Sequence, residues 1–249
     1  MKVTRIKCTV AYDGAAFFGY QVQPGQRTVQ GDIEAALQEV HKGRFIRISA
    51  SGRTDAGVHA MGQVFHFDTD TSIPPEKWPI ILNQKLQNDI AVLSSEAVSE
   101  DFHARFSVEA KEYRFIIDRG SVAMPFRRHH AVHYPFPLDV TSMREAAACL
   151  LGEHDFTSFS SAKTEVVDKV RTIHLIEITE HDTELIFRVK GNGFLYNMVR
   201  IIVGTLLEVG SGKYEPSDVK RMLEAKDRSA AGKTAPAHGL YLWEVEYKK

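Results

Sequence analysis

Apolar and polar side chains alternate along the chain from residue 3 to residue 12. A period of two is typical of a β-strand with one buried face. Further along, Thr28 precedes apolar residues at helical spacing between residues 29 and 40. A threonine in that place is a common N-cap, because its side-chain oxygen can accept a hydrogen bond from a free backbone N–H. These patterns predict a strand, a loop and then an amphipathic helix.

The rest of the chain mixes short alternating segments with segments of helical period. Strands are predicted at residues 45–50, 63–68, 90–98, 108–118, 169–179, 184–190 and 241–247. Helices are predicted at residues 76–87, 141–151, 193–209 and 216–225. Because several strands pattern as hairpins and few helices separate them, the sequence favours an α+β fold with a largely antiparallel sheet over a parallel βαβ series.

Residues 119–138 contain three prolines and show little periodicity, so we expect them to connect two halves. The expected organisation is an N-terminal α+β half at residues 1–118, this connection, and a C-terminal α+β half at residues 139–249. A chain of 249 residues of which 43% are hydrophobic can build buried cores in both halves. Its two cysteines lie in apolar runs and are expected to be reduced core thiols.

The overall charge does not by itself indicate a nucleic-acid partner. The formal net charge is −1, whereas a polyanion-binding protein often carries a basic excess. Cations are nevertheless concentrated between His103 and Arg119 and again at Arg127 and Arg128, so the folded protein could present a basic surface.

The first residues follow a strand pattern rather than that of a signal peptide, and the segment closest to a membrane span is interrupted by Arg200. We therefore expect a cytoplasmic protein with no membrane span.

The segment Gly52-Arg53-Thr54-Asp55-Ala56-Gly57 places an acid between two glycines. Glycine permits tight turns and lets a backbone come close to a ligand. Asp55 is therefore a candidate catalytic carboxylate, with Arg53 two residues before it. The same residues are also compatible with an ordinary connecting loop in which the aspartate stabilises a turn.

Arg200 lies within a predicted helix, residues 193–209, whose apolar residues cover nearly its whole circumference. Such a helix is expected to be buried. A guanidinium stays protonated and is costly to bury alone, so Arg200 needs a carboxylate or a phosphate as its partner. Asp55 is one candidate, but a purely structural ion pair with another acid would meet the same need. Gly191 and Gly193 at the expected helix start suggest free backbone N–H groups that could attract an anion.

Basic and aromatic residues interleave in two neighbouring segments. The first is Phe102-His103-Ala104-Arg105-Phe106, and the second is the predicted strand around Tyr113. Rings beside cations suit stacking on exposed RNA bases and contacts with phosphates. A strand with one core face and one solvated face would show the same pattern, so both interpretations stay open.

Three of the eleven histidines lie close together, at positions His129, His130 and His133. No cysteine or acid stands beside them at the spacing of a metal site. We expect these histidines to belong to a polar connection or to an RNA-binding face, and we expect no metal ion.

The string Gly52-Arg53-Thr54-Asp55-Ala56-Gly57-Val58-His59 resembles the catalytic motif of the TruA-type tRNA pseudouridine synthase family. Five further segments resemble the same family in the same order along the chain. They are Tyr12-Asp13-Gly14 with Gly19-Tyr20-Gln21, Asp101–Phe106, Leu151–Phe159, Asn197–Arg200 and Ala237–Leu242. An eight-residue motif is far more specific than a pair of glycines, and the resemblance extends almost from end to end.

The resemblance implies the pseudouridine synthase fold, in which two ferredoxin-like α+β halves have a joined sheet and the active site occupies a central cleft. It also implies a homodimer that binds one tRNA through both subunits, so that cations of two chains act on one polyanion. The chain departs from the family in two places. Tyr20 stands where many members carry Trp, and Ser160–Lys169 is not the basic loop that some relatives have.

The resemblance also assigns roles to individual residues. Asp55 would be the nucleophilic carboxylate, and Arg200 would keep it ionised and oriented. Tyr113 would stack on the target base and act as the catalytic base that finishes the proton transfers. Arg53 would enter the base stack as the target nucleotide flips out, and Leu240 would line the uracil pocket.

The implied reaction converts uridine to pseudouridine at positions 38, 39 and 40 of the tRNA anticodon arm, and the loop Phe102–Phe106 would contact the RNA. The C1′–N1 bond breaks and uracil rejoins the ribose through C5, with no redox change and no donor group, so we expect no cofactor. Two alternatives stay open. One is an RNA-binding or RNA-chaperone protein that has kept the fold, and the other is the same chemistry on another RNA.

Overall fold

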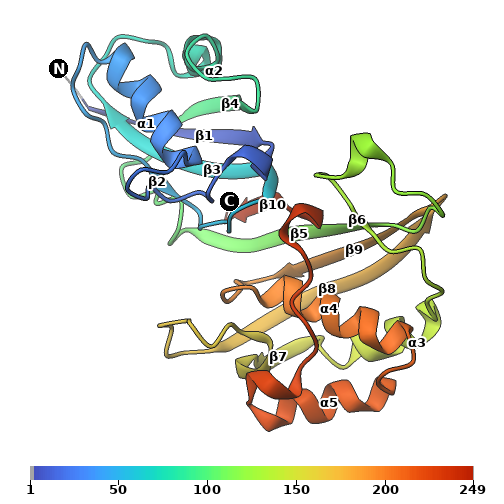
Figure 1. The fold of residues 1–249 in the computed structure, drawn as a ribbon. Helices are drawn as coiled ribbons and strands as arrows, with labels where there is room; N and C mark the ends of the chain where they lie inside the picture. The colour runs from blue at the N-terminus through green and yellow to red at the C-terminus, as the bar shows by residue number, and fades with distance from the viewer. Residues whose placement is uncertain (1–2, 249) are drawn as a thin grey trace. The chain divides into compact units, whose positions relative to one another are not determined.

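The alternating residues at the start of the chain form strand β1 (Thr4–Tyr12) in the computed structural model, which describes residues 3–248 (Figure 1). β1 lies between two antiparallel neighbours, β3 (His59–Thr69) and β4 (Ile90–Val98). Its inner face is buried, as the alternation predicts. The buried residues of this face are Ile6, Cys8, Val10 and Tyr12.

Two more strands complete the sheet of this first unit, whose strand order is β4-β1-β3-β10. The short β2 (Ser49–Ala50) pairs antiparallel with β3. β10 (Leu240–Tyr247) runs parallel to β3, with Tyr241 opposite His59. The end of the chain therefore returns to the unit in which the chain begins.

Helix α1 (Val29–Val40) covers one face of this sheet. Thr28 caps it as predicted, because its hydroxyl oxygen accepts a hydrogen bond from the N–H of Gly31 at 3.3 Å. The second helix, α2 (Trp78–Asn83), buries Trp78 and Leu82. Two short 3₁₀ helices, η1 (Gly14–Ala16) and η2 (Pro75–Lys77), lie in the connections.

The second unit has the strand order β5-β9-β8-β7. The predicted hairpin is formed by β8 (Val170–His181) and β9 (Glu184–Gly191), and β9 pairs antiparallel with β5 (Val108–Asp118). The edge strand β7 (Gly152–Asp155), which the sequence pattern does not predict, pairs antiparallel with β8. In the connecting segment, η3 (Pro125–Arg127) precedes the short β6 (Val132–His133), which runs parallel to β5.

Three helices pack in the second unit: α3 (Val140–Ala148), α4 (Met198–Gly210) and α5 (Pro216–Ala225). α4 is apolar on nearly every side and is buried over most of its length, as predicted. Gly204 of α4 has no room for a side chain, because a Cβ there would overlap the carbonyl of Lys233. The 3₁₀ helices η4 (Thr157–Phe159), η5 (Arg228–Ala230) and η6 (Ala237–Gly239) complete the unit.

Three predicted elements are shorter than expected by at least four residues. The strand at 45–50 is reduced to its last two residues, because 44–48 find no ladder partner among the described residues. The helix at 76–87 ends at Asn83, with Pro79 in its first turn, where a missing N–H does no harm. The helix at 193–209 begins only at Met198, because Asn197 adopts a left-handed conformation with φ 62°.

The two compact units consist of residues up to 109 together with 241 onward, and of residues 110–240. The predicted halves, residues 1–118 and 139–249, divide the chain at other places. The structure has the predicted fold class, a mixed α+β fold whose strands pair mostly antiparallel. Among residues 3–248, no helix is both long enough and apolar enough to cross a membrane.

Candidate active site

The loop that carries Asp55 joins β2 to β3 and lies directly against the turn after β1. Gly19 has φ +92°, and a Cβ on it would lie only 2.9 Å from the carbonyl oxygen of Thr54. A Cβ on Gly14 would overlap the carbonyl of Val58. Both glycines are therefore required by the close approach of two backbone segments. This explains why the segments around Gly14 and Gly19 accompany the aspartate motif.

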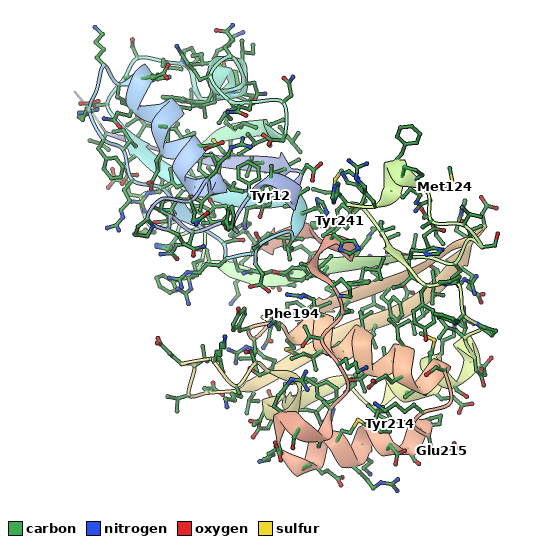
Figure 2. The ribbon with its side chains drawn as sticks, in the orientation of Figure 1. Tyr12, Met124, Phe194, Tyr214, Glu215 and Tyr241 are labelled. Atoms are coloured by element: carbon green, nitrogen blue, oxygen red, sulfur yellow. The ribbon has the colours of Figure 1, made fainter. Side chains whose placement is uncertain are left out.

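Hydrogen bonds fix the backbone on both sides of Asp55. The N–H of Tyr20 donates to the Thr54 carbonyl at 3.0 Å, and the hydroxyls of Tyr12 and Thr54 are 2.8 Å apart (Tyr12 is labelled in Figure 2). The N–H of Val58 donates to the Asp55 carbonyl at 3.1 Å, which closes a tight turn. Asp55 thus has a defined backbone position, while its residue stays partly accessible.

A buried glutamine on β3, Gln63, holds the start of this loop. Its Oε1 accepts a hydrogen bond from the Ser51 hydroxyl at 2.6 Å and another from the N–H of Val64 at 3.0 Å. Its Nε2 donates to the carbonyl of Gly52 at 3.0 Å. A fully buried amide is tolerated only when its groups are paired, so Gln63 is a supporting residue that the sequence interpretation missed. The only sign of this role in the sequence is that Gln63 is a polar residue within a strand that is otherwise mostly buried.

The end of the loop is held by His59, which is also buried. Its Nδ1 accepts a hydrogen bond from the N–H of Gly14 at 2.9 Å, and its ring stacks on Tyr241 at 4.6 Å between centroids. A nitrogen that accepts such a bond carries no proton. The carboxylate oxygen of Asp13, 3.1 Å from the same nitrogen, is therefore an electrostatic neighbour and not an acceptor.

Arg53 projects from the same loop and is exposed. Its side chain forms no ion pair or hydrogen bond with any residue of the described range 3–248. A cation beside an accessible carboxylate, on a loop with a fixed backbone, can contact an anionic ligand without first breaking an internal pair.

Arg200 belongs to the second unit, and its position differs from the prediction. It lies in the first turn of α4 and is partly exposed, rather than buried in mid-helix. Its Nε donates to the carbonyl of Ala235 at 2.8 Å, and its Nη1 donates to the side-chain oxygen of Asn197 at 2.9 Å. The late start of α4 also removes the predicted helix N-terminus at Gly191 and Gly193. These two hydrogen bonds help to orient the guanidinium within this unit.

Tyr113 lies on β5 opposite Val189 of β9 and is partly exposed. The ring of Phe194 contacts it edge-on, with centroids 5.1 Å apart and planes at 80°. Leu240, at the first position of β10, is buried. The preceding Gly239 lets the chain lie against the ring of Phe115, since a Cβ there would come within 2.7 Å of that ring.

The loop Phe102–Phe106 displays an aromatic ring to solvent. Phe106 is 77% exposed, and its ring lies 4.4 Å from that of His103. The guanidinium of Arg105 is 5.8 Å from the Phe106 ring and is exposed. Arg105 forms no ion pair with any other residue that the structure describes. A ring and a cation are therefore both available for a ligand.

Two side chains, those of His66 on β3 and Tyr247 on β10, hold the backbone of the same loop. The N–H of Ala104 donates to Nδ1 of His66 at 3.1 Å, and the hydroxyl of Tyr247 donates to the Ala104 carbonyl at 2.8 Å. Burial, followed by the positive charge of Arg5, lowers the pKa of His66 to about 4. His66 is therefore neutral near pH 7, as its role as an acceptor requires. Sequence patterns did not identify it.

The candidate residues are thus divided between the units. Arg53, Asp55 and the loop 102–106 lie in the first unit, whereas Tyr113 and Arg200 lie in the second. Of the three clustered histidines, His133 is held by a hydrogen bond between its Nε2 and the carbonyl of Gly120 at 2.7 Å.

An accessible carboxylate on a fixed loop, together with exposed cationic and aromatic side chains, is typical of an enzyme that acts on RNA.

Comparison with known proteins identifies the family. The profile described as tRNA pseudouridine synthase matches residues 9–107 and 146–248. The chain is 61% identical to tRNA pseudouridine synthase A of Bacillus pumilus and 58% identical to that of Bacillus subtilis, each over 244 residues that cover 98% of this chain and 99% of the relative. The enzyme of the same name from Bacillus licheniformis is 57% identical over the same share. The chain belongs to the tRNA pseudouridine synthase family, whose members are isomerases that convert uridine to pseudouridine.

Among solved structures, the archaeal box H/ACA sRNP Nop10–Cbf5 complex contains a chain that matches with a TM-score of 0.37 and 13% sequence identity. The match covers 90% of this chain and 59% of the other.

Proposed function

We propose that this protein converts uridine to pseudouridine in the anticodon arm of tRNA, at positions 38, 39 and 40, without a cofactor. The observation that carries the proposal is the construction of the Asp55 loop, which glycine contacts and buried hydrogen bonds hold while Asp55 stays accessible. The reaction needs a carboxylate but no external group, because the glycosidic bond to N1 is exchanged for a bond to C5, the C5 proton is lost and N1 gains a proton.

In this proposal Asp55 is the nucleophilic carboxylate. Arg200 acts on it in the reacting complex, since a nearby cation favours the ionised form of a carboxyl group. The two hydrogen bonds that orient Arg200 support such a role, because an oriented guanidinium can form a defined ion pair. Tyr113 stacks on the target uracil, and its half-exposed ring is compatible with that. Leu240 lines the uracil pocket.

The target nucleotide must leave the helical stack before it can react, which costs a few kcal/mol. We assign to Arg53 the role of entering the stack in its place, because it is exposed and adjacent to the catalytic loop. The loop Phe102–Phe106 contacts the RNA, with Phe106 offering a stacking surface and Arg105 a partner for phosphate.

The proposed partner is tRNA, bound by a homodimer in the cytoplasm. With a net charge of −1, the chain would hold a polyanion through local clusters of cations, and a dimer would bring the clusters of two chains to one tRNA.

The test is release of tritium from tRNA that contains uridine labelled with tritium at C5. The wild-type protein should release tritium, and Asp55→Asn should abolish release to below roughly a thousandth of that rate, because the amide is not a nucleophile. The matched control is Asp182→Asn, an exposed aspartate with φ +51°, a conformation that asparagine readily adopts. A wild-type protein that binds tRNA but releases no tritium would instead be an RNA-binding protein.

A further inference from the structure

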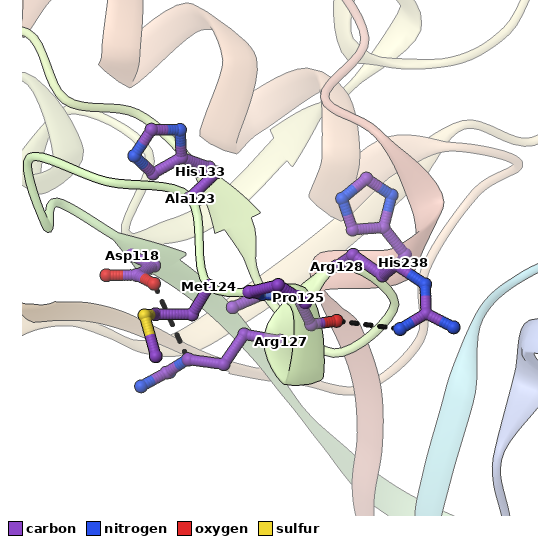
Figure 3. Close-up of a pocket in the computed structure, with 9 residues that line it drawn as sticks. Asp118, Ala123, Met124, Pro125, Arg127, Arg128, His133 and His238 are labelled. Carbon is purple, nitrogen blue, oxygen red and sulfur yellow. Dashed lines mark hydrogen bonds and ion pairs between the residues drawn. The ribbon is translucent and has the colours of Figure 1, made fainter.

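The second unit contains a pocket of about 350 Å³ that the proposed reaction does not use (Figure 3). It is built by the connecting segment between β5 and β6 and is completed by His238 of η6. His238 belongs to the Ala237–Leu242 segment, in which only Leu240 has been assigned a role. A space of this size accommodates roughly one nucleotide.

Two arginines line the pocket, and they differ in whether a carboxylate pairs with them. Arg127 faces Asp118, with Nε 3.6 Å from the carboxylate, and also pairs with Glu184. Arg128 donates to the backbone carbonyl of Pro125 at 2.8 Å and pairs with no carboxylate within residues 3–248. Arg128 is exposed, so its charge is available for an anion from outside the chain.

The pocket wall next to Arg128 is formed by His238. Figure 3 shows His238 and Arg128 together, away from the pair formed by Asp118 and Arg127. Burial lowers the pKa of His238, and the charges of His129 and Arg200 lower it further. These positive charges disfavour protonation of His238, and an anion bound beside the ring would offset them.

The remaining wall of the pocket is apolar, and a proline restricts its backbone at one position. Met124, labelled in Figure 2, and Pro125 line it. Met124 is 50% exposed, and proline fixes the backbone where η3 begins. Phe126 next to them is 88% exposed. A ligand that matches both walls has an anionic group joined to a flat or apolar body.

We propose that this pocket holds one nucleotide of the bound RNA chain, with its phosphate between Arg128 and His238 and its nucleoside against Met124. The proposal rests on tRNA being the ligand of this protein. It adds a contact outside the catalytic residues, one that positions the RNA rather than reacting with it.

The experiment measures the affinity for in-vitro-transcribed tRNA as a function of KCl concentration, for the wild type and for Arg128→Gln. Loss of one phosphate contact should raise Kd roughly five-fold and reduce the slope of log K against log [KCl] by about 0.7–0.9. Arg128→Lys should keep most of the slope, because the charge is retained. The matched control is Lys220→Gln, which removes an exposed charge of the same unit from α5 and should change neither quantity.

His238→Gln should raise Kd in the same direction, and the circular dichroism melt of each variant verifies that it is folded. The pocket proposal is overturned if folded Arg128→Gln matches Lys220→Gln in Kd and slope. It is also overturned if Arg128→Gln changes the mass of the protein in solution but not its RNA affinity, since the pocket would then hold another protein chain. Tritium release by the wild type is measured in the same preparation, so failure of the pocket and failure of the proposed reaction are separate results.

Discussion

At the residue scale, the glycines around the Asp55 loop have an effect that composition could not reveal. Gly14 and Gly19 are far from Asp55 in the sequence, yet each excludes a side chain because the backbone of the loop lies against it. Sequence analysis identified the glycines within the loop as the flexible points. The structure shows that the glycines outside it determine how closely the loop is held.

Gly19→Ala should destabilise the protein by about 2–3 kcal/mol and reduce tritium release, because it combines a positive φ with a contact of 2.9 Å to Thr54. Gly25→Ala is the matched control, since Gly25 also has a positive φ, +72°, but no atom of residues 3–248 beyond its own neighbours lies within 4 Å of its added Cβ. It should cost about 1 kcal/mol and leave the activity intact. Equal losses of unfolding free energy in urea for the two variants would contradict the close-approach argument.

His66 gives a prediction about pH. Its pKa is about 4 in the folded protein and about 6.5 in the unfolded chain, so the unfolded chain takes up the proton first as pH falls. The stability that neutral His66 contributes is complete above pH 6.5 and is lost between pH 6.5 and pH 4. The free energy of unfolding should fall by about 3 kcal/mol over this window.

The measurement is urea unfolding at several pH values for the wild type and for His66→Gln. Glutamine can accept the hydrogen bond from Ala104 but does not titrate, so the variant should show a shallower pH dependence. An unchanged dependence in the variant would mean that other groups, such as His103, whose pKa is also lowered, account for the effect.

At the scale of elements, the loop 102–106 and strand β5 show how one sequence pattern folds into two different structures. Interleaved rings and cations predicted either an RNA contact or an ordinary half-buried strand. The segment around Tyr113 is the predicted half-buried strand, whereas residues 102–106 form a loop that His66 and Tyr247 hold, which leaves Phe106 in solvent. The exposed ring supports the proposed RNA contact because the cation of Arg105 lies beside it, 5.8 Å from the ring.

Phe106→Ala should leave the unfolding free energy within about 0.5 kcal/mol of the wild type, because the ring is exposed. It should weaken tRNA binding by about 1–2 kcal/mol, roughly ten-fold in Kd, if one base stacks on the ring. Phe45→Ala is the control, because Phe45 is a phenylalanine of the same unit that is 59% exposed. Filter-binding measurements in which both variants bind like the wild type would rule out the stacking contact.

Helix α4 shows where periodicity misleads. Its apolar residues continue back to Phe194, so the pattern predicted a longer helix with Arg200 in its middle. The left-handed Asn197 ends that continuation and places Arg200 in the first turn, where it can reach Ala235 and Asn197. A single backbone conformation decided this, and hydrophobic periodicity carries no information about it.

At the scale of the whole molecule, the last strand belongs to the unit that contains the first. Leu242 on β10 is buried opposite Ala60 of β3, and Gly62 lies against the carbonyl of Trp243. Because this pairing joins residues far apart in sequence, no local pattern could have predicted it.

Leu242→Ala should lower the unfolding free energy of the first unit by about 2–4 kcal/mol, as expected when a buried leucine is truncated. Hydrogen exchange of the β3 amides should accelerate, since β3 is the partner of β10. Leu93→Ala, a change at a side chain that is 54% exposed on β4, should have an effect below about 0.5 kcal/mol. Unchanged exchange on β3 would argue that β10 contributes little to this unit.

Local order in this protein could be derived from its sequence, because it depends on neighbours along the chain. The alternation of β1, the Thr28 cap, the hairpin of β8 and β9, and helix α5 were all predicted with bounds within about two residues. The Asp55 motif was recognisable for the same reason, as an unbroken string of eight residues. What depends on long-range contacts required the folded chain: the glycines that press the loop into place, the buried Gln63 and His66, and the return of β10. Those features arise from backbone approach and burial between distant segments, which only tertiary packing creates.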